Sequence, residues 1–185
     1  MKLVFRCFFM IIFFSLVVII IASIALHKNP IYPKLKLYNY NSYQNIISGY
    51  AKAIDGDSII INQKEIRLYM IDAPEISQYC YDNKGNSYKC GIDSLRYLKS
   101  IINNNIINCY YQKKDIYDRY LAICFNDIIN INYKMIESGM AIIYNPANNN
   151  DKIIHNLENI AKTKKNGIWK GHFMIPKDYR YHNKR

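Results

Sequence analysis

The chain has 185 residues, which is enough for one domain of ordinary size and an N-terminal segment but not for several large domains. Its 25 lysines and arginines against 14 acidic residues give a formal net charge of +11. Only three charged residues, all basic, precede position 30, so the remainder keeps a net charge of +8 (22 basic and 14 acidic residues). This balance favours a polyanionic partner, either nucleic acid or a membrane surface.

Residues 7–26 form an uncharged, strongly apolar segment preceded by Lys2 and Arg6. The segment is long enough to span a bilayer, and the small residues at 23–25 also offer a cleavage site for a signal peptide. Residues 1–28 are therefore interpreted as a transmembrane anchor or a cleaved signal, with a buried helix as a third alternative. Both leading interpretations place the domain outside the cytosol. Residues 29–45 are expected to be a tether, 46–180 the folded domain, and 181–185 a basic tail.

Three short strands are expected to follow the tether, at residues 46–54, 58–61 and 65–71. An Asp55–Asp57 turn joins the first two, and a 62–64 turn joins the second and third. A hairpin folded at 62–64 brings the Asp57 end of one strand beside the Asp72 end of the next. Pro74 keeps the preceding residue extended, so the chain leaves the sheet where the acids gather.

Three carboxylates in this stretch predict an oxygen-only metal site formed by Asp57, Asp72 and Glu75. Such donors suit Ca²⁺ or Mg²⁺ better than zinc. Arg67, on the strand between them, offers a fork of donors suited to a phosphate. Each motif alone is common in turns and solvated strands, but their order and spacing together indicate half of a metal-dependent phosphodiesterase site. The second half is expected in DIYDRY, residues 115–120.

Apolar periodicity predicts the remaining elements of the domain. A core-packed helix is expected around residues 92–102, followed by strands at 106–112 and 120–125 joined by the connection 113–119. A second helix begins after Asn130 and ends before Gly139, and a third spans about 151–165. Five strands and three helices in the order βββαββαα suggest a small closed barrel with helices on one side.

The segments IDGDS, IRLYMIDAPE and DIYDRYLA resemble the signature segments of the staphylococcal nuclease (thermonuclease) family. The resemblance continues through GMAIIY to GIWKGHFMIPKDYR and covers roughly residues 48–180. It implies an α+β fold, a five-stranded OB-fold barrel with three helices, here preceded by the N-terminal hydrophobic helix. It also implies a calcium-dependent nuclease that hydrolyses DNA and RNA with little sequence specificity and without an obligate protein partner.

The same resemblance assigns roles to individual residues. It implies that Ca²⁺ is held by Asp57, Asp72 and the carbonyl of Ala73. Glu75 would hold or deprotonate the attacking water, and the scissile phosphate would be gripped by Arg67 and Arg119.

Two tyrosines, Tyr117 and Tyr144, match positions that contact the nucleotide in the family. One departure from the family pattern is Asp118, since the residue before the second arginine is usually glycine. Its carboxylate could weaken phosphate binding at Arg119 or point away from it. The alternative function for the same barrel is a non-catalytic nucleic-acid-binding module at the cell envelope, and a lipid- or protein-binding envelope domain is a further alternative.

Four of the five cysteines predict two local disulfides. Cys80 and Cys90 bracket one loop, while Cys109 and Cys124 flank the connection that carries Arg119. This pairing, out of three connectivities, needs only local closure. A zinc site is the alternative, but the spacings do not match those of zinc knuckles. Disulfides fit an exported domain.

Overall fold

The computed structural model describes residues 45–183, which belong to one compact unit of the chain. The predicted anchor or signal at 1–28, and almost all of the predicted tether, lie outside the described residues. Within residues 45–183, no helix combines the length and the apolar composition that a membrane crossing requires.

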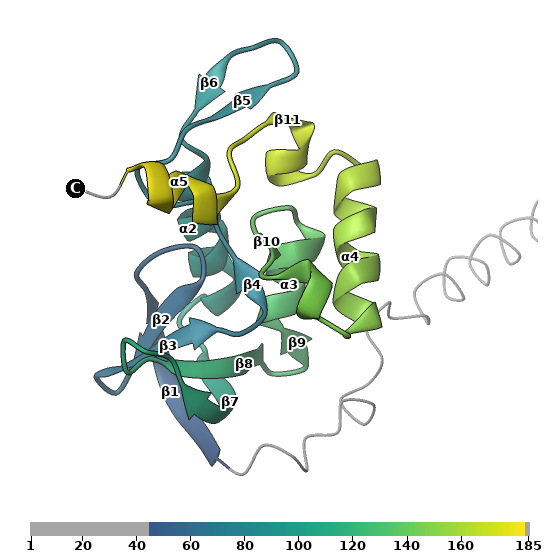
Figure 1. The fold of residues 1–185 in the computed structure, drawn as a ribbon. Helices are drawn as coiled ribbons and strands as arrows, with labels where there is room; N and C mark the ends of the chain where they lie inside the picture. The colour runs from purple at the N-terminus through teal and green to yellow at the C-terminus, as the bar shows by residue number, and fades with distance from the viewer. Residues whose placement is uncertain (1–44, 184–185) are drawn as a thin grey trace, which may run out of the picture. The chain divides into compact units, whose positions relative to one another are not determined.

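Five strands form the barrel: β1 (Asn45–Ala53), β2 (Ser58–Ile61), β3 (Lys64–Leu68), β7 (Ile106–Lys114) and β8 (Tyr120–Asn126). They are hydrogen-bonded in the order β3-β2-β1-β7-β8, and all these neighbours are antiparallel. The barrel closes because β3 also pairs with β8, in parallel, with Arg67 opposite Leu121 (Figure 1). The expected five-stranded OB-type barrel is therefore confirmed.

Tight turns set the register of the first three strands. Asn62 and Gln63 both have positive φ (49° and 63°), as a two-residue hairpin turn of type I′ requires, and Ser58 is consequently placed opposite Arg67. In the preceding turn the Asp57 N–H donates to Asp55 Oδ1 at 2.9 Å. Gly56 lets this turn approach the helix behind it, because a Cβ at this position would lie 2.2 Å from Ser94 Oγ.

The third strand is shorter than predicted, and this expectation was wrong. β3 ends at Leu68, Met70 takes a positive φ of 69°, and residues 71–72 form a separate strand, β4 (Ile71–Asp72). β4 pairs with β10 (Ile142–Ile143) instead of continuing along the barrel. The buried side chain of Asn132 stabilises the break, since its amide donates to the carbonyls of Tyr69 (2.9 Å) and Ala122 (3.1 Å).

The three predicted helices are present as α2 (Cys90–Ile102), α3 (Ile131–Glu137) and α4 (Lys152–Thr163). Asn130 caps α3 by accepting from the Tyr133 N–H at 3.0 Å, and Asp151 caps α4 in the same way through Ile153 N. A further helix, α5 (Pro176–His182), was not predicted and runs across position 180 into the expected basic tail. Short pieces complete the chain: β9 (Ile129–Asn130) and the 3₁₀ helices η3 (Pro146–Asn148) and η4 (Gly167–Lys170).

The loop that Cys80 and Cys90 bracket contains two strands of a small sheet. β5 (Cys80–Asp82) pairs with β6 (Ser87–Tyr88) on one side and with β11 (Gly171–His172) on the other. The structure contains both expected disulfides, Cys80–Cys90 and Cys109–Cys124. The first lies in a small apolar cluster with Ile142 and Ile168, against which Trp169 and Phe173 pack. The C-terminal segment is thereby fastened to the loop that follows Glu75.

Candidate active site

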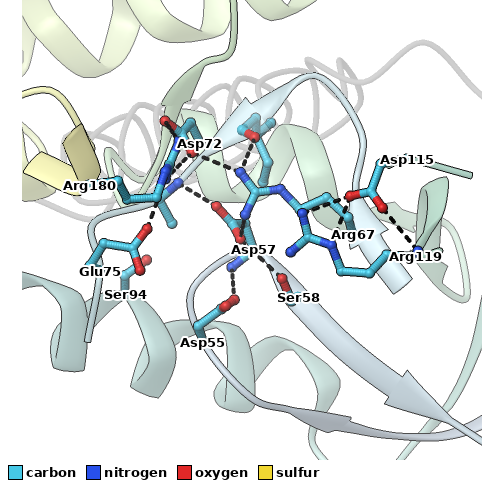
Figure 2. Close-up of polar contacts among 12 residues, drawn as sticks. Asp55, Asp57, Ser58, Arg67, Asp72, Glu75, Ser94, Asp115, Arg119 and Arg180 are labelled. Atoms are coloured by element: carbon cyan, nitrogen blue, oxygen red, sulfur yellow. Dashed lines mark hydrogen bonds and ion pairs between the residues drawn. The ribbon is translucent and has the colours of Figure 1, made fainter. Parts of the chain in front are cut away.

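Arg67 bridges two buried carboxylates (Figure 2). One guanidinium nitrogen donates to Asp57 Oδ1, and the other donates to Asp72 Oδ1 at 2.7 Å. The side chains of Asp57 and Asp72 are only 3% and 2% exposed, and that of Arg67 is 14% exposed. The hairpin and the bend at Met70 thus bring together the acids that the sequence separates by fifteen positions (72 − 57).

Asp57 accepts two hydrogen bonds besides the one from Arg67. Its Oδ2 accepts from the Ala73 N–H at 2.7 Å, and its Oδ1 accepts from Ser58 Oγ at 3.2 Å. Burial raises the pKa of Asp57 to about 8, and the nearby carboxylates act in the same direction, while Arg67 and the Ala73 N–H oppose the change. An ionised carboxylate here needs positive charge beside it.

Arg180, which sequence reasoning missed, is the second arginine on this cluster. From α5 its Nη1 donates to Asp72 Oδ1 at 2.9 Å and to Glu75 Oε1 at 2.8 Å, and its Nη2 donates to Asp72 Oδ2 at 3.1 Å. Figure 2 shows the guanidinium lying between the two acids. The one available signal was Pro176, which favours a helix start just before Arg180. Nothing in the sequence connects this helix with acids about a hundred positions earlier.

The predicted second half of the site lies on the same side of β3 as Arg67 (Figure 2). Arg119 Nη1 is 4.0 Å from Glu65 Oε1, and Glu65 is two positions before Arg67, hence on the same face of β3. Arg119 is oriented by Asp115, whose Oδ2 accepts from Nε at 2.8 Å and from Nη2 at 2.7 Å. Tyr117 lies beside it, with its ring centre 5.4 Å from the Arg119 Cζ.

Asp115 is therefore the carboxylate that is hydrogen-bonded to Arg119, a contact that sequence reasoning missed. Partial burial alone would raise the pKa of Asp115, but hydrogen bonds from Arg119 and from the backbone N–H groups of Arg119 and Tyr117 outweigh burial and lower it. Asp118, by contrast, points away: it accepts from Lys114 Nζ at 2.8 Å, and its side chain is 83% exposed. Its positive φ of 65° explains why glycine suits this position.

Tyr144 lies at the end of β10, next to the strand that carries Asp72. Its N–H donates to the Met70 carbonyl at 2.8 Å, so the bend after β3 fixes its backbone. The tyrosine is 44% exposed, and Tyr117 is 74% exposed. Both tyrosines are thus accessible to solvent.

The donors at the cluster suit a hard cation. Asp57 and Asp72 offer carboxylate oxygens, and the adjoining Ala73 offers a backbone carbonyl, which is the donor type that Ca²⁺ and Mg²⁺ prefer. In the described part of the chain, no three His, Cys, Asp or Glu side chains are grouped as a ready metal site. A cation here would use two carboxylates, with carbonyl and water oxygens completing its shell. The residues fit such an ion by donor chemistry and by the charge that buried acids require.

The closed barrel and the acids bridged by arginines define an OB-fold protein with a strongly charged site beside β3. Residues 65–171, more than half of the chain, match the model of the family described as "Staphylococcal nuclease homologue". The chain therefore belongs to the staphylococcal nuclease family, and the fold expected from that resemblance is confirmed.

Several curated proteins are similar to this chain. The succinoglycan biosynthesis protein ExoI of Rhizobium meliloti (strain 1021) is 33% identical over 126 residues, which cover 67% of this chain and 65% of that protein. The chain thus spans slightly less than two thirds of this relative. An "Uncharacterized endonuclease" of Escherichia coli O157:H7 is 30% identical over 130 residues, covering 68% of this chain and 78% of the relative. A protein of the same name from Haemophilus influenzae is 30% identical over 123 residues, which cover 64% of this chain and 63% of that relative.

Proposed function

We propose that this protein is a phosphodiester hydrolase, a calcium-dependent nuclease that cleaves DNA and RNA with little sequence specificity. The observation that carries the proposal is the pairing of Arg67 with the two buried acids, Asp57 and Asp72. Arg119 lies on the same face of β3 as Arg67, and the partly exposed Glu75 lies near Asp72, since Arg180 contacts both acids. Membership of the staphylococcal nuclease family supports it, as do relatives whose names include endonuclease.

The carboxylates of Asp57 and Asp72 and the Ala73 carbonyl would hold Ca²⁺, which when bound polarises a phosphoryl oxygen and lowers the pKa of water. Glu75 is 34% exposed on its side chain, so it can reach solvent and accept the proton of the attacking water. Arg67 and Arg119 donate to the non-bridging phosphate oxygens, where negative charge grows as the water attacks. Asp115 holds the Arg119 fork in one orientation for this contact.

Binding of the polymer needs little reading of bases. The phosphate contacts are independent of sequence and sensitive to salt, and the net charge of +8 outside the N-terminal segment favours them. Tyr117 and Tyr144 present exposed rings on which bases can stack, and such stacking tolerates any base. Both properties favour a nuclease that accepts single-stranded DNA and RNA.

Two disulfides in one small domain indicate an oxidising environment. We therefore place the domain outside the cytosol, either anchored in the membrane by residues 1–28 or released after their cleavage. We expect the domain to fold under oxidising conditions and to fail to fold under reducing ones.

The test uses an oxidised fragment beginning at about residue 29 and fluorescent single-stranded DNA and RNA. Calcium should support cleavage, and a chelator should abolish it. Glu75→Gln should still bind the substrate but should cleave it at a strongly reduced, residual rate. The matched control is Glu137→Gln, which removes a glutamate on α3 whose carboxylate pairs with Lys134. Substrate binding without cleavage, in calcium and unchanged by Glu75→Gln, would refute the nuclease proposal in favour of the binding module.

A further inference from the structure

The last helix of the described chain is fastened to the loop that carries Glu75. The fully buried side chain of Gln78 accepts from the Glu75 N–H at 3.2 Å and donates to the Met174 carbonyl at 2.7 Å. The Tyr179 hydroxyl donates to the Ser77 carbonyl at 3.1 Å. Two independent contacts therefore set the position of α5 against residues 75–78. In Figure 1, α5 is the yellow helix near β4, the strand whose Asp72 it contacts through Arg180.

Because α5 is held in this position, the guanidinium of Arg180 contacts both Asp72 and Glu75. Arg180 Nη1 contacts Asp72 and Glu75 together, and Nη2 contacts the second oxygen of Asp72. Asp72 is itself fixed by burial and by Arg67, so it serves as a rigid anchor for the arginine. A planar fork held at Asp72 leaves Nη1 pointing in a defined direction, toward Glu75. Through Arg180, the fixed position of Asp72 therefore restricts the position of the Glu75 carboxylate.

Glu75 has few other constraints. It follows Pro74 in a stretch without helix or strand, and its side chain is one third exposed. Among the described residues, the Arg180 contact is the one hydrogen bond to its carboxylate, and it engages Oε1. Without it, the three side-chain torsions of a glutamate would spread the carboxylate over several rotamers. A base that must meet one water beside one phosphate loses rate when it is spread in this way.

We propose that Arg180 is a positioning residue of the nuclease site. Its guanidinium, presented by the docked α5 and anchored on Asp72, holds the Glu75 carboxylate where it accepts the proton of the attacking water. Oε2 of Glu75 then takes that proton while Oε1 stays bonded to Arg180. The inference rests on the proposed function, because it concerns the base of that same reaction.

The test measures kcat and KM of the full oxidised chain for the wild type, Arg180→Ala, Arg180→Lys and Lys177→Ala. Lys177 is an exposed residue of the same helix and serves as the matched control for the loss of one positive charge. A displaced base predicts a kcat that falls about 10- to 100-fold in Arg180→Ala, with KM nearly unchanged. Arg180→Lys should recover only part of the rate, since a point charge cannot bond both acids as a fork does. Lys177→Ala should match the wild type.

Three further measurements separate positioning from a structural role. Millimolar guanidinium ion should raise the rate of Arg180→Ala and leave that of Lys177→Ala unchanged. In a Glu75→Gln background, Arg180→Ala should cause little additional loss, because residues that act as a unit are not additive. Calorimetric titration with Ca²⁺, which needs no turnover, should show that Arg180→Ala binds the ion at least as tightly as the wild type, since the variant loses a positive charge beside Asp72.

The outcomes are distinct. An undiminished kcat in Arg180→Ala, or the same loss with and without the Glu75 carboxylate, overturns the positioning role. Tighter Ca²⁺ binding with a higher rate also overturns it and makes Arg180 a competitor of the cation. If the wild type itself cleaves nothing in calcium, the proposed function fails, and the inference fails with it. If Arg180→Ala does not fold, the comparison of Arg180→Lys with the wild type in both Glu75 backgrounds decides the question.

Discussion

Replacing Arg67 by glutamine should strongly destabilise the calcium-free protein. Arg67 is 14% exposed and lies between two carboxylates that are 3% and 2% exposed, so the substitution leaves two buried acids without their shared counter-ion. Breaking a buried pair in this way costs about 3–5 kcal/mol. Arg180 still contacts Asp72 in the variant, which places the expected loss at the lower end, ~3 kcal/mol.

The assay is urea denaturation of the oxidised protein in a chelator, followed by the fluorescence of Trp169, the single tryptophan. The matched control is Arg96→Gln on α2, since Arg96 pairs with Asp93 at 3.4 Å with side chains 75% and 40% exposed. An exposed pair contributes only about 0–1 kcal/mol. If Arg67→Gln lost no more stability than Arg96→Gln, the desolvation argument for the acidic cluster would be refuted.

Three further predictions concern the hairpin that carries Arg119. Replacing Cys109 and Cys124 by alanine should lower the free energy of unfolding by ~3 kcal/mol, as loop-closure entropy gives for a separation of 15 residues. Asp118→Gly should leave turnover unchanged, because its carboxylate points to solvent. Asp115→Asn should lower turnover by freeing the Arg119 fork. In the wild type, the lowered pKa of Asp115 means that its stabilisation is present above its ordinary pKa and is lost as the pH falls through the lowered value.

The corresponding measurements are urea unfolding of the double cysteine variant, steady-state kinetics, and acid unfolding of Asp115→Asn beside the wild type. Equal acid-unfolding curves for these two proteins would contradict the role of Asp115. A clear gain in turnover for Asp118→Gly would show that its carboxylate does reach the phosphate. An unchanged unfolding free energy without the Cys109–Cys124 bond would contradict the entropy argument.

The first half of the site was predictable because it is local. A two-residue turn at Asn62 and Gln63 decides the register of β2 and β3, and that register places Ser58 opposite Arg67. This register also brings Asp57 to the place where the chain leaves β3, so that its carboxylate contacts Arg67 and the Ala73 N–H. The same locality explains why both cysteine pairs could be matched from their positions along the chain.

The missed features depend on partners that are distant in sequence. Nothing within residues 65–72 indicates that the strand breaks at Met70, because the hydrogen bonds that stabilise the break come from Asn132 on α3. Strands of two or three residues, such as β4 and β11, are too short to show periodicity. Arg180 reaches the acids because hydrogen bonds of Tyr179 and Gln78 hold α5 in place. The sequence of this seven-residue helix does not indicate which part of the domain it packs against.

The parallel pairing of β3 with β8 fixes the distance between two segments that are far apart in the sequence. Arg67 lies within that ladder and Arg119 directly precedes Tyr120, so backbone pairing sets the spacing of the two Cα atoms. Neighbouring strands lie about 4.8 Å apart whatever chain connects them. The connection between β3 and β8 includes the β5–β6 hairpin, α2 and β7, and a change of length within these elements need not move the backbone of either arginine. The backbone distance between Arg67 and Arg119 is therefore independent of how long this connection is.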